Sequence, residues 1–206
     1  MSEVVPAGPV PAARRPGRPP DLEKRQAILD AAREVLAEVG YASMTIDAVA
    51  QRAGSNRVLI YRVWDTKLAL ARDALLGGDS DFVVPDTGEL RADLRDFTAQ
   101  QVARMTRPAY LMGVPGLTVE LMSDPALFRD TYERYVKPSE DGYRTIVANA
   151  VERGELAAPA ATVDGSVLTR LVSGFVTSLA QSGRHDVDEI TDLAVAALVG
   201  VLRDPA

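Results

Sequence analysis

Cysteine is absent from this 206-residue chain, and histidine occurs once. Without cysteine there are no disulfides, thiol nucleophiles or thiolate metal sites. His185 lies in a polar turn between Arg184 and Asp186, the usual setting of a solvated side chain. The HExxH, GxSxG, P-loop and dinucleotide-binding patterns are also missing. The sequence therefore predicts no metal site, no cofactor and no enzyme.

Long hydrophobic runs are absent as well. No apolar run approaches the ~20 residues that cross a bilayer, and the first residues lack the apolar core of a signal peptide. We therefore expect no membrane partner and a cytoplasmic protein. With 47% hydrophobic residues, the chain can bury a full core without a metal or disulfide.

An overall basic charge, the common footprint of a DNA-binding protein, is lacking: the net charge is −6. The two parts of the chain differ, however. Residues 1–70 carry ten Lys and Arg against eight Asp and Glu, a net +2, whereas residues 71–206 carry thirteen against twenty-one, a net −8. The modest basic excess lies in the N-terminal third.

Residues 45–67, TIDAVAQRAGSNRVLIYRVWDTK, predict two short helices separated by a glycine turn. Thr45 and Asn56 are good N-caps, and Gly54 suits the left-handed residue that ends the first helix. Such a pair forms a helix-turn-helix, whose second helix enters the DNA major groove.

The second helix is predicted to turn Ile60 and Val63 inward and Arg57, Val58, Tyr61 and Arg62 largely outward. Arginine can bond a guanine edge with two hydrogen bonds, valine can touch a thymine methyl, and a tyrosine hydroxyl can bind a phosphate. The alternative is that these residues are only solvated or cover the edge of the core.

The run from Gly17 to Leu70 resembles the DNA-binding domain of the TetR family of bacterial transcription regulators. The resemblance is carried by Gly40-Tyr41, Thr45-Ile46, Ala53-Gly54 and Ile60-Tyr61-Arg62, with Trp64 and Lys67 after them. It implies phosphate contacts for Thr45, Tyr61 and Lys67 and base contacts for Arg57 and Val58.

The sequence departs from the family pattern at Ser55, Leu59 and Asp65. Leu59 leaves the base-reading pattern open, and Asp65 competes with Thr66 as the cap of a fourth helix. The predicted DNA-binding residues are Thr45, Arg57, Val58, Leu59, Tyr61, Arg62 and Lys67.

Residues 1–20 hold six prolines and little apolar periodicity, which predicts a disordered arm. In the family such arms often enter the minor groove, which attracts arginine. Arg14, Arg15 and Arg18 are therefore further candidates for DNA contact. The alternative is a solubilising tail.

The periodicity of the remaining chain predicts an all-α fold. A three-helix helix-turn-helix domain with a linking helix is expected over 21–76, beginning at Asp21, followed by a connection at 77–88. Residues 89–206 are expected to form a larger helical bundle, less regular around Pro108 and Pro115, and with Pro138 interrupting a long helix.

Several short motifs in this second part resemble the sensor and dimerisation domain of one TetR subgroup. They are TGELRADL at 87–94, Asp124-Pro125, Val136-Lys137-Pro138 and VERGEL at 151–156. The resemblance implies a ligand-sensing and dimerisation domain over 89–206.

The last two helices, 163–181 and 187–202, are the least polar part of the chain, which favours half of a two-fold four-helix interface. The predicted dimer residues are Val167, Leu168, Leu171, Gly174, Phe175, Leu193 and Ala197. A plain core hairpin is the alternative.

Aromatic and methionine residues concentrate in the middle helices and favour a small apolar or aromatic effector. The candidate pocket residues are Phe97, Tyr110, Met122, Phe128 and Tyr132, although each of them also suits a filled core. We predict a homodimeric repressor that binds a double-stranded, inverted-repeat operator and is released by a ligand. A ligand-independent DNA-binding protein and a helical enzyme with paired carboxylates are the alternatives.

Overall fold

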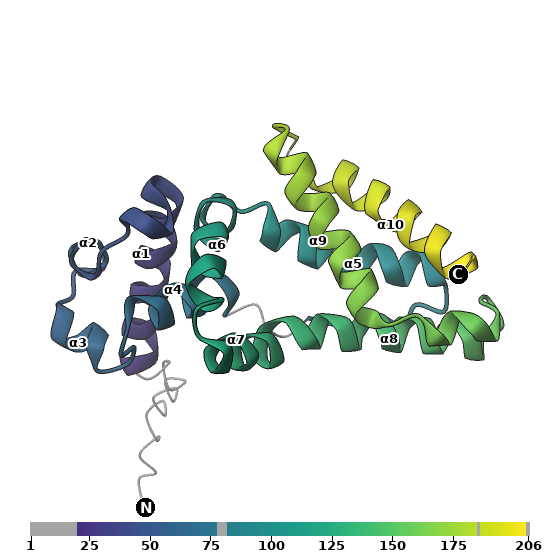
Figure 1. Ribbon diagram of the computed structural model, residues 1–206, viewed down its shortest axis with the longest axis horizontal. Coiled ribbons are helices and arrows are strands. Elements are labelled where there is room, and N and C mark those ends of the chain that lie inside the picture. The colour runs from purple at the N-terminus through teal and green to yellow at the C-terminus, as the bar shows by residue number, and fades with distance from the viewer. Residues whose placement is uncertain (1–19, 78–81, 185, 205–206) are drawn as a thin grey trace, which may run out of the picture.

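The computed structural model describes residues 20–77, 82–184 and 186–204, and their regular elements are all helical (Figure 1). The all-α class predicted from the sequence is confirmed. We call residues 20–77 the head. Its helices are α1 (Pro20–Ser43), α2 (Ile46–Arg52), α3 (Arg57–Tyr61) and α4 (Lys67–Leu76).

The described residues from 82 onward, which we call the body, form six α-helices and two short helices of other types. They are α5 (Leu90–Met105), α6 (Pro108–Leu121), α7 (Pro125–Thr131), the π-helical segment η1 (Tyr132–Val136), α8 (Lys137–Glu152), the 3-10 helix η2 (Ala158–Thr162), α9 (Gly165–Gln181) and α10 (Val187–Arg203). Among the helices described here, none is long and apolar enough to cross a membrane.

Most helix ends of the head follow from the capping residues in the sequence. The Thr45 hydroxyl accepts from the Ala48 amide at 3.2 Å, and the Asn56 carbonyl oxygen accepts from the Leu59 amide at 3.0 Å. Gly54 has φ 58°, the left-handed conformation expected of the turn. One start differs, since α1 begins at Pro20 instead of after Asp21. Of the two caps that the sequence left open for α4, Thr66 is the one used.

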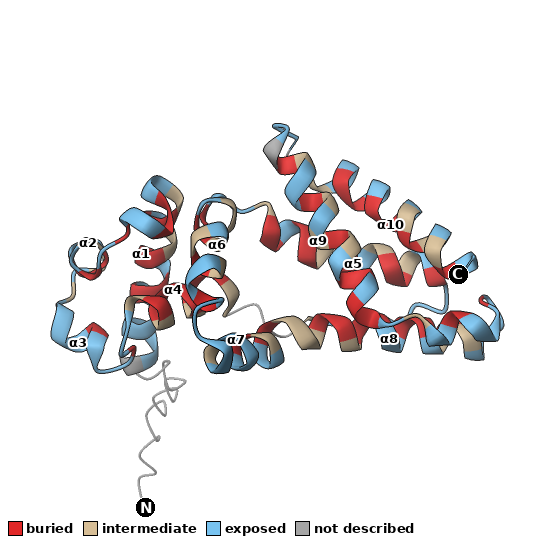
Figure 2. Cartoon of the chain, in the orientation of Figure 1, coloured by how far each residue is buried: buried red, intermediate tan, exposed pale blue. Residues whose placement is uncertain are grey.

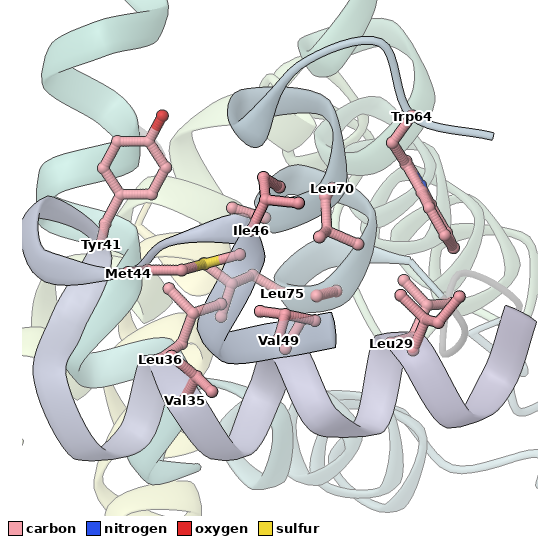
Figure 3. Packing of buried hydrophobic residues seen from close by; sticks show 14 of the residues in the cluster. Leu29, Val35, Leu36, Tyr41, Met44, Ile46, Val49, Trp64, Leu70 and Leu75 are labelled. Carbon is pink, nitrogen blue, oxygen red and sulfur yellow. The ribbon is translucent and has the colours of Figure 1, made fainter. Parts of the chain in front are cut away.

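The core of the head forms where α2 and α4 pack on α1 (Figure 3). Leu36 of α1, Val49 of α2 and Leu70 of α4 are fully buried there, and Trp64 covers one end of the cluster. This packing holds α3, which is too short to be stable alone, at the edge of the head.

Helix α6 belongs to the body by sequence but packs into the core of the head. Its Leu117 and Leu121 are buried in that core, and α6 stands between α1 and α5, α9 and α10 of the body in Figure 1. Gly113 and Gly116 permit the close approach, since a Cβ on Gly116 would lie 3.1 Å from the Tyr41 Cβ. The segment around Pro115 is therefore a regular helix, contrary to the expectation, because tertiary packing compensates for the missing N–H.

A second core joins α5, α8, α9 and α10. Phe97 of α5 lies at its centre, in edge-to-face contact with Tyr143 of α8 at 4.9 Å between ring centroids. Gly142 makes this crossing close, because a Cβ there would meet the Phe97 ring at 2.2 Å.

The predicted interruption at Pro138 takes the form of a π-helical segment. Pro138 has no N–H for the carbonyl of Arg134, and the chain changes register just before it, where the Lys137 amide donates to Tyr132. Helices α7 and α8 are thereby joined through η1 instead of split. Such π-helical insertions are frequent at functional sites.

Candidate nucleic-acid interface

Helix α3 presents an exposed surface of mixed chemistry at the far end of the head (Figure 1). Ile60 is fully buried and anchors the helix, as the sequence predicts, whereas Val58 is 74% exposed. Leu59 and Tyr61 are also exposed. The surface therefore offers an aliphatic group and a phenol side by side, both suited to a DNA groove and its backbone.

Arg57, at the first position of α3, is held by a carboxylate that the sequence analysis did not include. Its Nε lies 3.2 Å from Oδ1 of Asp47 on α2, and both side chains are more than half exposed. An exposed ion pair of this kind contributes only about 0–1 kcal/mol. Asp47 thus orients the Arg57 guanidinium, and the pair is weak enough for the guanidinium to bind a DNA base instead.

Val63 is the one residue of this region whose predicted orientation is wrong: it is 48% exposed. Helix α3 ends at Tyr61, so the helical spacing that pairs Ile60 with Val63 no longer applies. Instead, the amides of Val63 and Trp64 both donate to the Ile60 carbonyl, and Trp64 takes the buried position.

Lys67, a predicted phosphate contact, is engaged within the head. Its Nζ donates to the Tyr41 carbonyl at 3.2 Å and lies 4.4 Å from the centroid of the Tyr41 ring. The Tyr41 hydroxyl in turn donates to Glu120 of α6 at 2.6 Å. Burial raises the pKa of Tyr41, with Glu120 adding to the effect. A phosphate contact by Lys67 stays a prediction and requires the ammonium to be shared with Tyr41.

A shallow hollow beside α3 adds basic residues that the sequence analysis missed. Lys24 and Arg25 of α1 line it together with Arg62, and the other lining residues are Leu22, Ile28, Ser55, Leu59 and Val63. The lining contains cations but no carboxylate. These charges come together only because the fold places the start of α1 beside α3, so no local pattern could have indicated them. Arg14, Arg15 and Arg18 lie outside the described residues.

The outer side of α9 and α10 carries most of the predicted dimer residues. Val167, Gly174 and Leu193 are exposed, and Leu171, Phe175 and Ala197 are partly exposed. Buried and exposed positions alternate along both helices in Figure 2. The prediction of Leu168 as a dimer residue is wrong. Leu168 lies on the opposite side of α9, fully buried in the core of its own chain, and is not available to a partner.

The predicted pocket residues are not gathered around one cavity. Phe97 is fully buried and fills the body core, whereas Met122 and Phe128 are 70% and 45% exposed on the outside of the bundle. Tyr110 lines a narrow hollow between head and body, and the Tyr132 hydroxyl donates to Glu140 at 2.5 Å. These five residues were chosen by composition, which does not distinguish a core position from a surface one.

Catalytic and metal chemistry finds little support in the described residues. Within them, no group of three or more Asp, Glu or His side chains is placed to hold a metal ion. His185 lies outside the described residues. The Tyr143 hydroxyl is paired with Thr98 at 3.0 Å, and burial raises the pKa of Tyr143 to about 12, so this phenol stays protonated at neutral pH.

Comparison with known proteins identifies similar chains along most of the length. A family model described as "Bacterial regulatory proteins, tetR family" matches residues 28–74, and one described as "Tetracyclin repressor-like, C-terminal domain" matches residues 84–198. The chain is 28% identical over 188 residues to the HTH-type transcriptional regulator YdeS of Bacillus subtilis, covering 90% of this chain and 93% of the relative.

Two further similarities concern function and fold. The chain is 31% identical over 131 residues to the DNA-binding transcriptional repressor TetR of Mycobacteroides abscessus, covering 63% of this chain and 68% of that protein. The transcriptional regulator FadR from Bacillus subtilis, solved in complex with stearoyl-CoA, superposes with a TM-score of 0.66 at 16% identity, covering 88% of this chain and 98% of FadR.

Proposed function

Because this chain belongs to the TetR family and is a DNA-binding transcription regulator, we propose that it is a homodimeric repressor of an inverted-repeat operator, released by a small effector. The observation that carries the proposal is the exposed face of α3, where Arg57, Val58 and Tyr61 stand clear of the protein's own core. Lys24, Arg25 and Arg62 add positive charge beside it for the DNA backbone.

The dimer is supported by the outer side of α9 and α10. A Cβ on Gly174 would meet no atom of its own chain within 4 Å, so a neighbouring helix can approach closely there. These helices lie toward the end of the molecule opposite α3 (Figure 1), which leaves the reading surface free in a dimer. Two copies would then present two α3 helices to successive major grooves, about 34–36 Å apart.

The effector we propose is a small, largely apolar molecule that binds the body, in the cytoplasm. The apolar core between α5, α8 and α9, which contains the buried phenol of Tyr143 as a hydrogen-bonding group, supports this chemistry. FadR, a protein of the same fold, was solved with stearoyl-CoA, whose acyl chain is apolar although its coenzyme A portion is anionic. Acyl-CoA thioesters are therefore the first compounds to try, with the acyl chain as the part that the body core would bind.

A second candidate, a ligand-independent DNA-binding protein, is favoured by one observation. Phe97 packs between Phe82 and Tyr143 and fills the interior of the body. An effector would therefore have to displace side chains in order to enter.

Selection of duplexes from random DNA, followed by titration of the selected site with and without stearoyl-CoA and shorter acyl-CoA thioesters, tests the proposal. We expect an inverted repeat and, with the active thioester, a 5- to 150-fold loss of affinity, equal to the loss of thioester affinity caused by DNA. Selective DNA binding that no thioester changes would favour the second candidate for this ligand class. Failure to select any sequence would contradict operator recognition itself.

A further inference from the structure

Asp73, in the middle of α4, is bonded to both the head and the body. Its Oδ2 accepts the Trp64 indole N–H at 3.0 Å and faces an Arg25 guanidinium at 3.4 Å. Its Oδ1 accepts the Tyr135 hydroxyl at 2.9 Å. Arg72 lies 3.4 Å from that same oxygen. We call Asp73 and these four partners the Asp73 hub.

The two carboxylate oxygens of Asp73 reach two parts of the molecule: Oδ2 bonds residues of the head, and Oδ1 bonds Tyr135 of the body. Trp64 lies in the turn after α3, the proposed recognition helix, and its backbone amide donates to the Ile60 carbonyl of that helix at 2.9 Å. Tyr135 belongs to η1, the π-helical segment of the body. One carboxylate is thus hydrogen-bonded both to the segment that ends the recognition helix and to the irregular turn of the body.

The contacts of the Asp73 hub are largely buried, so we expect them to be stronger than ion pairs at the surface. The Asp73 side chain is only 14% exposed, and Trp64, Arg72 and Tyr135 are all buried. Charge-assisted hydrogen bonds in such surroundings are among the stronger ones, and losing one partner leaves a buried polar group unsatisfied. Burial also raises the pKa of Tyr135, and the charge of Asp73 adds to the effect, so the phenol remains a donor.

The cations around the hub connect it to α7 as well. Arg72 bonds Asp130 of α7 at 2.9 Å and lies 5.7 Å from the centre of the Tyr135 ring. Arg134 lies over the same ring at 6.0 Å. A register change in η1 would move Tyr135 relative to this set, because a π-helical hydrogen bond spans five residues instead of the four of an α-helix.

We propose that Asp73 is a positioning residue that couples η1 to the recognition helix: when η1 holds Tyr135 on Asp73, Trp64 and the end of α3 are fixed for DNA. The inference rests on the proposed function and adds the regulatory route to it. The packing of α6 on α1, with its Tyr41–Glu120 bond, is a separate connection. Loss of the hub therefore loosens α3 without detaching the head.

Tyr135→Phe tests the proposal, and Tyr132→Phe is its matched control. Both remove one phenolic oxygen from η1, but Tyr132 bonds Glu140 within the body, not the head. In the DNA-free protein, hydrogen exchange should report on the Val63 and Trp64 amides, which both donate to Ile60. We expect Tyr135→Phe to accelerate their exchange at least threefold and Tyr132→Phe to change it less than twofold. Equal rates in the two variants would overturn the proposal.

Operator titration supplies the second measurement. Tyr135→Phe should weaken binding to the selected duplex about 3- to 10-fold, with the dimer intact, and Tyr132→Phe less than twofold. In a Trp64→Phe background, which removes the indole hydrogen bond to Asp73, Tyr135→Phe should have little further effect. Additive losses would show that Tyr135 does not act through the hub. Because the exchange experiment needs no DNA, the hub can be upheld or refuted even if no operator is found.

Discussion

At the scale of single residues, we propose that base recognition depends most on the exposed guanidinium of Arg57. We expect Arg57→Ala to cost about 1–3 kcal/mol on the operator and to relax preference at one base pair per half-site. Lys67→Ala should instead weaken operator and random DNA alike and reduce the salt slope. Titrations of both DNAs at several salt concentrations separate the two effects. An equal loss on both DNAs for Arg57→Ala would identify a phosphate contact.

The residues of this region show which features of single side chains can be predicted from the sequence. Capping follows from side-chain chemistry a few residues away, so Thr45, Asn56 and Gly54 are placed correctly. The orientation of Val63 could not be predicted, because it depends on whether the helix continues past Tyr61 or yields the buried position to Trp64. The pairing of Arg57 with Asp47 likewise requires the angle between α2 and α3.

At the scale of elements, α5 and α8 cross closely at Gly142. A methyl group on Gly142 would overlap the Phe97 ring, so Gly142→Ala should destabilise the protein by about 1–3 kcal/mol through overpacking. Thr145→Ala, at an exposed position of α8, is the control and should be neutral or slightly stabilising, because alanine has the higher helix propensity. Urea unfolding of both variants measures the difference. Equal midpoints would contradict the close crossing.

The start of α5 is joined to the end of α8 by Glu155. Its carboxylate accepts the Leu90 amide at 2.8 Å and an Arg153 N–H at 2.6 Å, and these bonds lower the pKa of Glu155 below its usual 4.5. A lowered folded-state pKa stabilises the protein above about pH 4.5, and the contribution is lost as the pH falls through the folded-state value. Arg153 also donates to Asp93, and Asp93 is present both in the wild type and in the Glu155→Gln variant.

Glu155→Gln should therefore lower the melting temperature at pH 7, and the difference from the wild type should shrink below about pH 4.5. Thermal unfolding of the two proteins from pH 7 to pH 3.5 is the measurement. A difference that grows as the pH falls would have the wrong sign for this account.

Helix boundaries in the body were largely predictable because they depend on local signals such as Asp124-Pro125 and Gly154. The partners of each helix were not. The burial of α6 in the head, of Leu168 in its own chain and of Phe97 in the body core all depend on which helices meet. An apolar residue at helical spacing indicates a buried side, but it does not tell which neighbour covers that side.

At the scale of the whole molecule, the proposed dimer places an outer surface of α9 and α10 between two chains. Gly174→Glu should bury an unpaired charge there and weaken the dimer by about 3 kcal/mol or more, roughly 100-fold. Ala148→Glu, on an exposed position of α8, is the control for adding the same charge elsewhere. Sedimentation over a concentration series checks both variants. A Gly174→Glu protein as dimeric as the wild type would require another interface.

The central claim is that two chains read an inverted repeat, each through its own α3. The most direct test measures the stoichiometry and affinity of the wild-type protein on the selected operator and on a duplex with one half-site scrambled. We predict two chains per operator and at least about 100-fold weaker binding to the scrambled duplex, because the second head then contacts only the phosphate backbone. One chain per duplex, with affinity retained within about threefold on the scrambled site, would contradict the account.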